Sequence, residues 1–249
     1  MPEMLFYERT VPLNAQTHAN LKMRPAQGFA YAARSNSAPI LASEFFNCAG
    51  EYPIVFARGD TGLVPMVLLG LREGENLFVD AGGKWAARYI PAFVRRYPFV
   101  PAKGAQGELL VCIDEASPCF DGSAGEALFT TGKPTAHLQH VLKFLTEFHQ
   151  GALATEALMR RLEALKLFRE ADSLAQPKAG GQFRLGGLHV IDETRLHALD
   201  ATTAHGLLLD GGLGLIYAHR VSLGNLAALM ERMPGTHGRG ATTKPVARR

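Results

Sequence analysis

The residues best suited to chemistry lie in one window, from Lys84 to Phe99. This window contains the sole tryptophan of the chain, four other aromatic residues and three arginines. Guanidinium groups bind anions through forked hydrogen bonds, and both guanidinium groups and aromatic rings stack on planar ligands. The window therefore predicts a surface for an anionic or aromatic ligand. Its predicted ligand-binding side chains are Trp85, Arg88, Tyr89, Arg95, Arg96 and Tyr97.

A structural interpretation of the same window stays open beside the functional one. Buried aromatic residues usually belong to the core, so these rings would anchor a sheet to a helix. The arginines would then pair with acids such as Asp80 or Asp114 at the edge of the core. Pro91 fits the first turn of a short helix, where proline is tolerated. Asp114 and His219 are the polar candidates that we expect near the ligand surface.

Other chemistry has weaker support in the sequence. Asp114 and Glu115 end a predicted strand, where carboxylates can act as acid and base, although such residues more often solubilise a loop. His137 and His140 are three residues apart on a predicted helix, but no carboxylate or cysteine occupies a matching position. We therefore predict no metal site. The glycine-containing turns match neither a phosphate-binding loop nor a dinucleotide fingerprint, so we also predict no cofactor.

Composition narrows the class of protein. The chain has 249 residues, of which 47% are apolar and 20% charged, as in an ordinary globular protein. No apolar run reaches the roughly 18 residues of a membrane-spanning helix, and acids occupy the positions where a signal peptide would be basic. Its three cysteines are expected to be buried thiols in a reducing compartment. We expect a cytoplasmic protein that is not embedded in a membrane.

The basic charge belongs to the end of the chain. The formal net charge is +3, and removing the four cations that follow Pro234 leaves −1. A nearly neutral body argues against nucleic acid as a partner. We predict one α+β domain over residues 1–233, and a basic, disordered tail over residues 234–249.

Strands and helices do not alternate regularly, which disfavours an open parallel sheet. Two apolar runs on either side of Gly59–Gly62 predict a β-hairpin. The fold class that we expect is α+β, with a mainly antiparallel sheet, a helical insertion and a C-terminal helix. Other strands are predicted around residues 29–33, 77–80, 108–114 and 188–191, and short helices at 39–49, 91–96 and 192–199.

The predicted helical insertion covers about residues 123–171. Ser123 and Glu126 fit a capping box for a short helix. Two amphipathic helices follow and form an antiparallel pair, because Gly151 ends or bends the first and Thr155 can cap the second. Further along, residues 206–219 read as a strand, an Asp-Gly turn and a strand, and Ser222 caps the last helix.

Several motifs in the chain resemble the SapC family of bacterial proteins. The most distinctive is the order Trp85, Tyr89-Ile-Pro91 and Arg95-Arg-Tyr-Pro-Phe99. Similar segments lie before and after it, at 51–56, 70–80, 112–114 and 213–223, so the resemblance covers roughly residues 6–233. It implies a bacterial protein encoded beside TonB-dependent receptors, flavin-dependent tryptophan halogenase-like proteins and cupin-like proteins. No established reaction accompanies the family, and therefore no catalytic residues are carried over.

Three functional hypotheses follow. The leading one is a non-catalytic cytoplasmic accessory or small-ligand-binding protein of a nutrient-uptake or modification system. In it, the segment Trp85–Phe99 lines the surface for a small molecule or a protein partner. The alternative is an enzyme acting on a small metabolite, together with a halogenase or oxygenase partner. It requires Asp114, Glu115, His219 and the two helical histidines to converge in one pocket. The third is an assembly protein whose apolar helix faces form a homo-oligomer.

Overall fold

The computed structural model describes residues 6–104, 108–120, 124–171 and 186–233. Every strand pairing in these ranges is antiparallel, and helices close the C-terminal end, so the predicted α+β class is confirmed. The strands are β1 (Thr10–Pro12), β2 (Lys22–Met23), β3 (Ser37–Pro39), β4 (Ile54–Gly59), β5 (Gly62–Leu68), β6 (Phe99–Lys103), β7 (Leu109–Asp114), β8 (Glu126–Ala127), β9 (Phe129–Thr130), β10 (Lys133–Pro134), β11 (Phe168–Glu170) and β12 (Leu188–Ile191). The α-helices are α1 (Phe45–Ala49), α2 (Ala92–Arg95), α3 (Ala136–Ala164), α4 (Glu193–His197), α5 (Ala201–Leu209), α6 (Gly212–Ser222) and α7 (Asn225–Glu231), and the 3-10 helices are η1 (Ala30–Ala32), η2 (Ala42–Glu44) and η3 (Pro118–Phe120).

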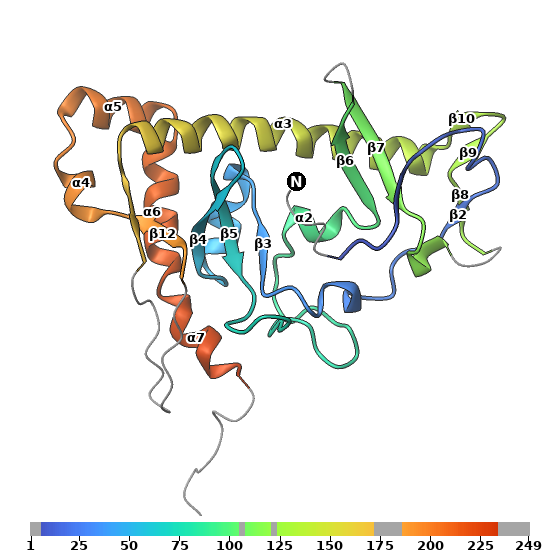
Figure 1. The fold of residues 1–249 in the computed structure, drawn as a ribbon, viewed down its shortest axis with the longest axis horizontal. Helices are drawn as coiled ribbons and strands as arrows, with labels where there is room; N and C mark the ends of the chain where they lie inside the picture. The colour runs from blue at the N-terminus through green and yellow to red at the C-terminus, as the bar shows by residue number, and fades with distance from the viewer. Residues whose placement is uncertain (1–5, 105–107, 121–123, 172–185, 234–249) are drawn as a thin grey trace, which may run out of the picture.

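Two larger sheets organise the described part of the chain (Figure 1), and β10-β9 and β2-β8 form two further sheets of two strands each. The larger has the strand order β11-β12-β4-β5-β3, and the predicted hairpin over Gly59–Gly62 is its centre. The smaller has the order β1-β7-β6 and contains the predicted strand at 108–114 together with β6, which the sequence did not predict. Its edge strand β1 comes from the N-terminal arm, which pairs with β7 about a hundred residues later.

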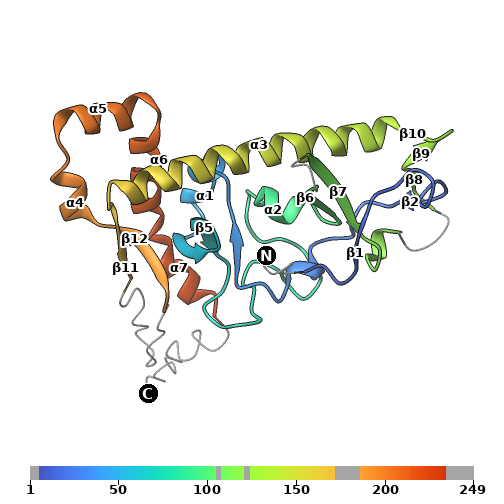
Figure 2. The ribbon, with the colours of Figure 1, turned by 45° about the horizontal axis from the view of Figure 1, so that its top comes forward.

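Helix α3 runs along both sheets as one uninterrupted helix of 29 residues (Figures 1 and 2). The predicted antiparallel helix pair is therefore wrong. Gly151 lies inside the helix and does not end it. Its lack of a side chain makes room for Leu41, since a Cβ atom at Gly151 would lie 2.9 Å from Leu41 Cδ1. Thr155 does not cap a helix either. Its hydroxyl donates to Gly151 O at 2.7 Å and accepts the Ala42 N–H at 2.8 Å, which fastens η2 to α3.

The segment predicted as a second hairpin forms helices α5 and α6 instead. Asp200 caps α5 by accepting the Thr203 N–H at 2.9 Å. Gly211 then takes a left-handed conformation, with φ of +80°, and turns the chain into α6. Apolar leucine runs fit either a strand or a buried helix, and here the packing of α6 on β4 and β12 favours the helices, with the cap and the glycine at their ends. Ser222 is the last residue of α6 and does not cap α7.

Three shorter predictions are also corrected. Residues 29–33 contain the 3-10 helix η1, and residues 77–80 form turns with one isolated bridge between Val79 and Trp85. Residues 126–130 form the short strands β8 and β9 in place of the predicted capped helix, although Ser123 itself lies outside the described residues. The predicted short helices at 39–49, 91–96 and 192–199 are confirmed as η2 with α1, as α2 and as α4.

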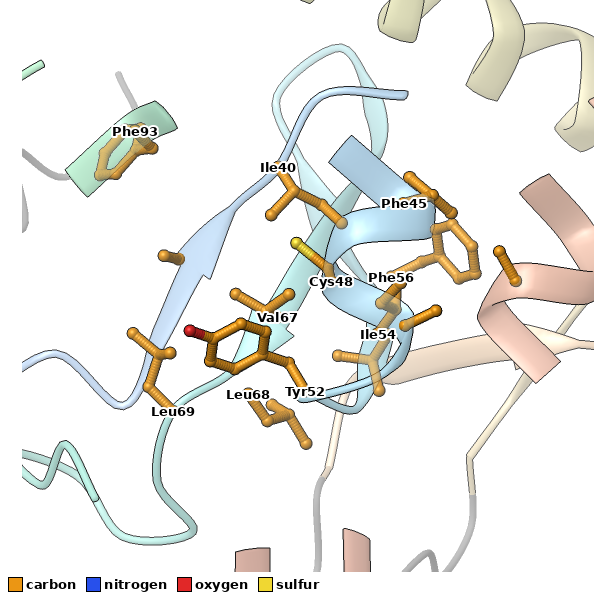
Figure 3. Packing of buried hydrophobic residues seen from close by; sticks show 14 of the residues in the cluster. Ile40, Phe45, Cys48, Tyr52, Ile54, Phe56, Val67, Leu68, Leu69 and Phe93 are labelled. Carbon is orange, nitrogen blue, oxygen red and sulfur yellow. The ribbon is translucent and has the colours of Figure 1, made fainter. Parts of the chain in front are cut away.

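The core has a main cluster around β4, β5 and α1, seen at close range in Figure 3. Tyr52, Ile54 and Phe56 fill its centre, and each is at most 1% exposed. A second cluster lies between the smaller sheet and the first half of α3. Helix α3 supplies Leu138 and Leu145 to the second cluster and Met159 and Leu162 to the main one. One helix thus joins two of the three hydrophobic clusters in the described residues.

Candidate functional site

Trp85 is a buried hub of the fold. The side chain is 5% exposed, and its Nε1–H donates to Tyr52 Oη at 2.8 Å. The Tyr52 hydroxyl in turn donates to the backbone carbonyl of Tyr89. Burial raises the pKa of Tyr52, so the phenol stays protonated and keeps this role as donor. These contacts support the structural interpretation of Trp85, whose indole N–H and ring are both engaged inside the protein.

Tyr89 is tied to a buried carboxylate. Its hydroxyl donates to Glu44 Oε1 at 2.8 Å, and the Ala92 N–H donates to the same oxygen at 2.7 Å. The other oxygen of Glu44 accepts the Leu41 N–H at 2.8 Å. Burial, and next the neighbouring Glu44, raise the pKa of Tyr89 to about 12. Glu44 thereby holds the start of α2 against the start of α1.

The three arginines find partners other than Asp80 and Asp114. Arg88 is exposed, with its Nε 3.9 Å from Glu51 Oε1. Arg95 Nε donates to Ile90 O at 2.9 Å, and its guanidinium carbon lies 5.8 Å from the ring centroid of Tyr89 and 5.4 Å from that of Phe144. Arg96 is half-buried: its guanidinium carbon lies 4.0 Å from the ring centroid of Phe93 and 5.0 Å from that of Phe148. The expected ion pairs with Asp80 or Asp114 are therefore replaced by an ion pair with Glu51 for Arg88, and by cation–π and backbone contacts for Arg95 and Arg96.

Asp114 ends β7 and is 1% exposed. Its carboxylate accepts the backbone N–H groups of Glu8, Arg9 and Ala116, at 3.1, 2.8 and 3.2 Å. These bonds fix the N-terminal arm beside the smaller sheet. The side-chain oxygens of Asp114 are thus satisfied by backbone donors, as a buried polar group requires.

His219 is fully buried in α6, against the larger sheet. Its Nδ1–H donates to Ile54 O at 2.9 Å, and its Nε2 accepts the Ile191 N–H at 3.2 Å. This pair of bonds requires the neutral imidazole, and burial lowers its pKa to about 4. His219 therefore ties β4, β12 and α6 together. Figure 1 shows α6 and β7 at different ends of the molecule, so Asp114 and His219 do not share a site.

His137 and His140, on the first turns of α3, are also remote from α6 and its His219 (Figure 1). His137 lies in the first turn of α3, with its Nδ1 3.3 Å from Glu126 Oε2. Within the described ranges, no three His, Cys, Asp or Glu side chains are grouped so that they could hold a metal ion. In the same ranges, no helix combines the length and the apolar character that crossing a membrane demands. The convergence that the enzyme hypothesis requires does not occur.

A cavity of about 240 Å³ lies next to the end of the aromatic window. Tyr97 forms one wall and stacks on Tyr31, with 4.0 Å between ring centroids. Arg24 and Gln27 contribute polar groups, and Pro118 and Cys119 of η3 close another side. The remaining lining comes from small residues of the loop before η1, so the surroundings are mainly apolar.

The cavity is shaped by a tight backbone contact. The Phe29 N–H donates to Gly83 O at 2.7 Å, which places the loop before η1 against the turn before Trp85. Gly28 takes φ of +98°, and a Cβ there would lie 2.6 Å from Gly83 O. Only glycine fits this approach. On the other side, the Arg24 N–H donates to Cys119 O at 2.9 Å and fixes the loop to η3.

Of the predicted ligand-binding residues, Tyr97 alone lines this cavity. Arg24, Gln27, Tyr31 and Cys119 were not predicted as site residues. Arg24, Gln27 and Tyr31 lie in one short segment, far in sequence from Tyr97 and from Cys119. Contacts such as the hydrogen bond from the Arg24 N–H to Cys119 O and the stack of Tyr31 on Tyr97 bring these segments together. The prediction that the cysteines are buried free thiols is confirmed for all three.

The fold and this cavity define the chain as an antiparallel α+β protein with a small, largely apolar cavity and one guanidinium group in its lining. The family model described as SapC matches residues 13–229, and the chain therefore belongs to the SapC family. No curated protein and no solved structure matches the chain.

Proposed function

We propose that the protein is a non-catalytic accessory protein that binds a small anion with a flat, apolar body. The cavity beside Tyr97 is the proposed binding site. The observation that carries the proposal is the combination, in one cavity, of an arginine with a wall of two stacked tyrosines. A guanidinium group recognises a carboxylate, while aromatic and small apolar groups receive the rest of the ligand.

The contacts of Arg24 support this role. Its Nη2 donates to Pro118 O at 3.4 Å, a long hydrogen bond that a carboxylate oxygen would readily replace. The Tyr31 hydroxyl already donates to Val94 O at 2.9 Å, which fixes the ring as a rigid wall. The cavity volume of about 240 Å³ favours a ligand with one ring over a nucleotide or a peptide.

The side chains suited to proton transfer support binding over catalysis. Asp114, Glu44 and His219 are buried, and backbone or tyrosine partners occupy their polar atoms. A general acid or base must reach a proton of the substrate. The proposed cellular role, that of an accessory to an uptake or modification system in the bacterial cytoplasm, rests on the family resemblance.

Calorimetry and thermal unfolding with a matched ligand pair test the proposal. Benzoate and benzamide have the same ring, but only benzoate carries a charge. We expect benzoate to bind and to raise the melting temperature more than benzamide does, because a ligand of the native state stabilises it by mass action. Arg24→Gln should remove the preference for benzoate.

Arg88→Gln is the matched control, because it removes an equal charge from a residue that is exposed outside the cavity. Its binding should equal that of the wild type. A wider panel of small carboxylates, amino acids, sugars and flavins extends the screen beyond benzoate. The proposal fails if no member of the panel stabilises the protein, or if Arg24→Gln and Arg88→Gln affect binding equally.

A further inference from the structure

Each of the two larger sheets ends in two edge strands. The five-stranded sheet ends in β3 and β11, and the three-stranded sheet ends in β1 and β6. The backbone N–H and C=O groups on the outer side of an edge strand can pair with an added strand, from a second copy of the chain or from a peptide. The state of these groups therefore decides whether either sheet can be extended.

The first outer edge is that of β1. In an antiparallel pair, the N–H and C=O groups of one residue point to one side of the strand, and those of the next residue point to the other side. The Leu13 N–H donates to Val111 O at 2.9 Å, so Thr10 and Pro12 face away from β7. Because proline has no N–H group, the outer edge of β1 lacks a donor at Pro12.

Strand β3 has the same arrangement. The Ile40 N–H donates to Pro65 O of β5 at 3.0 Å, so Ser37 and Pro39 face outward. Strands β1 and β3 are each three residues long, and in each of them one of the two outward positions is a proline. An added strand would lose a hydrogen bond and meet the proline ring at either edge.

Strand β6 is longer, with five residues, and its outer edge is blocked at two positions. Its even-numbered residues bond to β7, so Phe99, Pro101 and Lys103 face outward. The Phe99 N–H donates to Arg96 O at 2.8 Å, and Phe99 O accepts the Tyr7 hydroxyl at 3.1 Å. Both backbone groups of Phe99 are therefore occupied, Pro101 offers no donor, and Lys103 adds an exposed charge.

Strand β11 contains no proline, and arginines block its outer edge instead. Its odd-numbered residues bond to β12, so Phe168 and Glu170 face outward. Arg195 Nη1 donates to Lys166 O at 2.8 Å and to Phe168 O at 3.2 Å. Arg169 Nη1 donates to Glu170 O at 3.2 Å. The outward carbonyl groups that a partner strand would need are thus occupied by guanidinium groups.

We propose that the fold prevents strand addition at all four outer edges of the two larger sheets in the described part of the chain. Prolines prevent it on β1, β3 and β6, and two arginines prevent it on β11. One consequence concerns the kind of partner: a protein or a second copy that binds this chain uses its side-chain surfaces, and not a strand added to these sheets. A second consequence is that the apolar strands stay out of intermolecular sheets.

Pro101→Thr tests the proposal on β6. It introduces an outward N–H together with a residue that favours strands. Ala102→Thr is the matched control, because the Ala102 N–H faces β7 and this variant adds the same side chain without an outward donor. Thioflavin T fluorescence of the agitated full chain measures the formation of intermolecular sheets. The lag of Pro101→Thr should be shorter than that of Ala102→Thr by about fivefold or more, because one net backbone hydrogen bond per contact changes an association constant by about that factor.

Pro101→Lys separates the effect of the outward N–H from that of a lower stability. Like Pro101→Thr it lacks the proline, but its charge at the edge opposes strand addition. Pro101 is half-buried, so a lysine side chain at this position can extend into solvent. We expect the lag of Pro101→Lys to stay close to that of the wild type. Circular dichroism and urea unfolding confirm that each variant is folded before agitation.

Arg195→Met tests the edge of β11 independently. It frees two outward carbonyl groups for a partner strand, and should also shorten the lag. Arg58→Met is the matched control. Arg58 pairs with Glu163 as Arg195 pairs with Asp192, and the two arginine side chains are 59% and 53% exposed, but Arg58 lies on the inner strand β4.

The proposal predicts fast sheet formation for Pro101→Thr and Arg195→Met, and slow sheet formation for the wild type and the three other variants. It is overturned if Pro101→Thr forms sheets no faster than Ala102→Thr, or if Pro101→Lys forms them as fast as Pro101→Thr. It is equally overturned if Arg195→Met behaves like Arg58→Met.

Discussion

Lowering the pH should weaken the fold through His219 in particular. The imidazole is fully buried and uses both ring nitrogens, one as donor to Ile54 O and one as acceptor from the Ile191 N–H. Protonation would place a hydrogen on Nε2, which could then no longer accept the Ile191 N–H and would face it as a second donor. Burial accordingly lowers the pKa of His219 from 6.5 to about 4 in the folded protein.

The sign and size of the effect follow from linkage. Above pH 6.5, His219 is neutral in both the folded and the unfolded chain, so its titration does not change the free energy of unfolding. Between pH 6.5 and 4, only the unfolded chain binds the proton, so the free energy of unfolding falls as the pH falls. The loss amounts to roughly 2 kcal/mol between pH 7 and pH 5, and to about 3 kcal/mol once the folded pKa is passed.

Urea unfolding at several pH values, followed by the fluorescence of the sole tryptophan, measures this loss. His219→Gln keeps a donor and an acceptor but does not titrate. The variant will be less stable at pH 7, because its amide cannot match the ring geometry, so the informative quantity is the pH dependence. We expect the wild type to lose roughly 2 kcal/mol more than the variant between pH 7 and pH 5. Equal pH dependence in the two proteins would refute the reasoning, since the other histidines and the acids are common to both.

Three further predictions concern buried groups. Asp114→Ala removes the acceptor of three backbone N–H groups, and should lower the free energy of unfolding by about 3 kcal/mol; unchanged urea unfolding and unchanged proteolysis of the N-terminal arm would contradict this role. Thr155→Val leaves the Ala42 N–H without its acceptor and should cost about 2 kcal/mol, whereas Thr155→Ser should cost much less; equal losses would show that the hydroxyl is unimportant. Burial raises the pKa of the Cys48 thiol, so a disulfide reagent at pH 8 should modify it only as the protein unfolds, and fast modification of the native chain would argue against this packing.

Local patterns predicted the elements whose signals are short and unambiguous. Two β-rich runs around Gly59–Gly62 form the central hairpin, and the apolar run before Asp114 forms β7. Pro91 precedes α2 directly, as its position in the predicted short helix suggested. In each case the turn or the proline acts on the backbone within a few residues, and the distant contacts of the fold agree with it.

The predictions that failed depended on distant contacts. Gly151 would weaken an isolated helix, but in the folded protein it makes room for Leu41, and Thr155 bonds across to η2. The leucine runs on either side of Gly211 fit a strand as well as a helix, and the packing of α6 on β4 and β12 favours the helix.

The cavity could not be predicted from the sequence for the same reason. Its arginine, its tyrosines and its cysteine come from segments that are joined by the contact between Arg24 and Cys119 and by that between Phe29 and Gly83. The aromatic window predicted only the wall that Tyr97 provides. A window rich in arginine and aromatic residues looks the same in sequence whether it binds a ligand or fills a core.

The contacts of α6 with β4 also bear on the order in which the chain can fold during synthesis. Ser222 accepts the Ile54 N–H at 2.9 Å, and His219 accepts from β12 and donates to β4. These partners are separated by up to 168 residues. The strand β4 therefore leaves the ribosome long before α6, the helix that packs on it. Its apolar residues stay without this helix until most of the chain has been synthesised. A nascent chain that stops before α6 should consequently be a substrate for chaperones, and the last helices should act as the step that completes the fold.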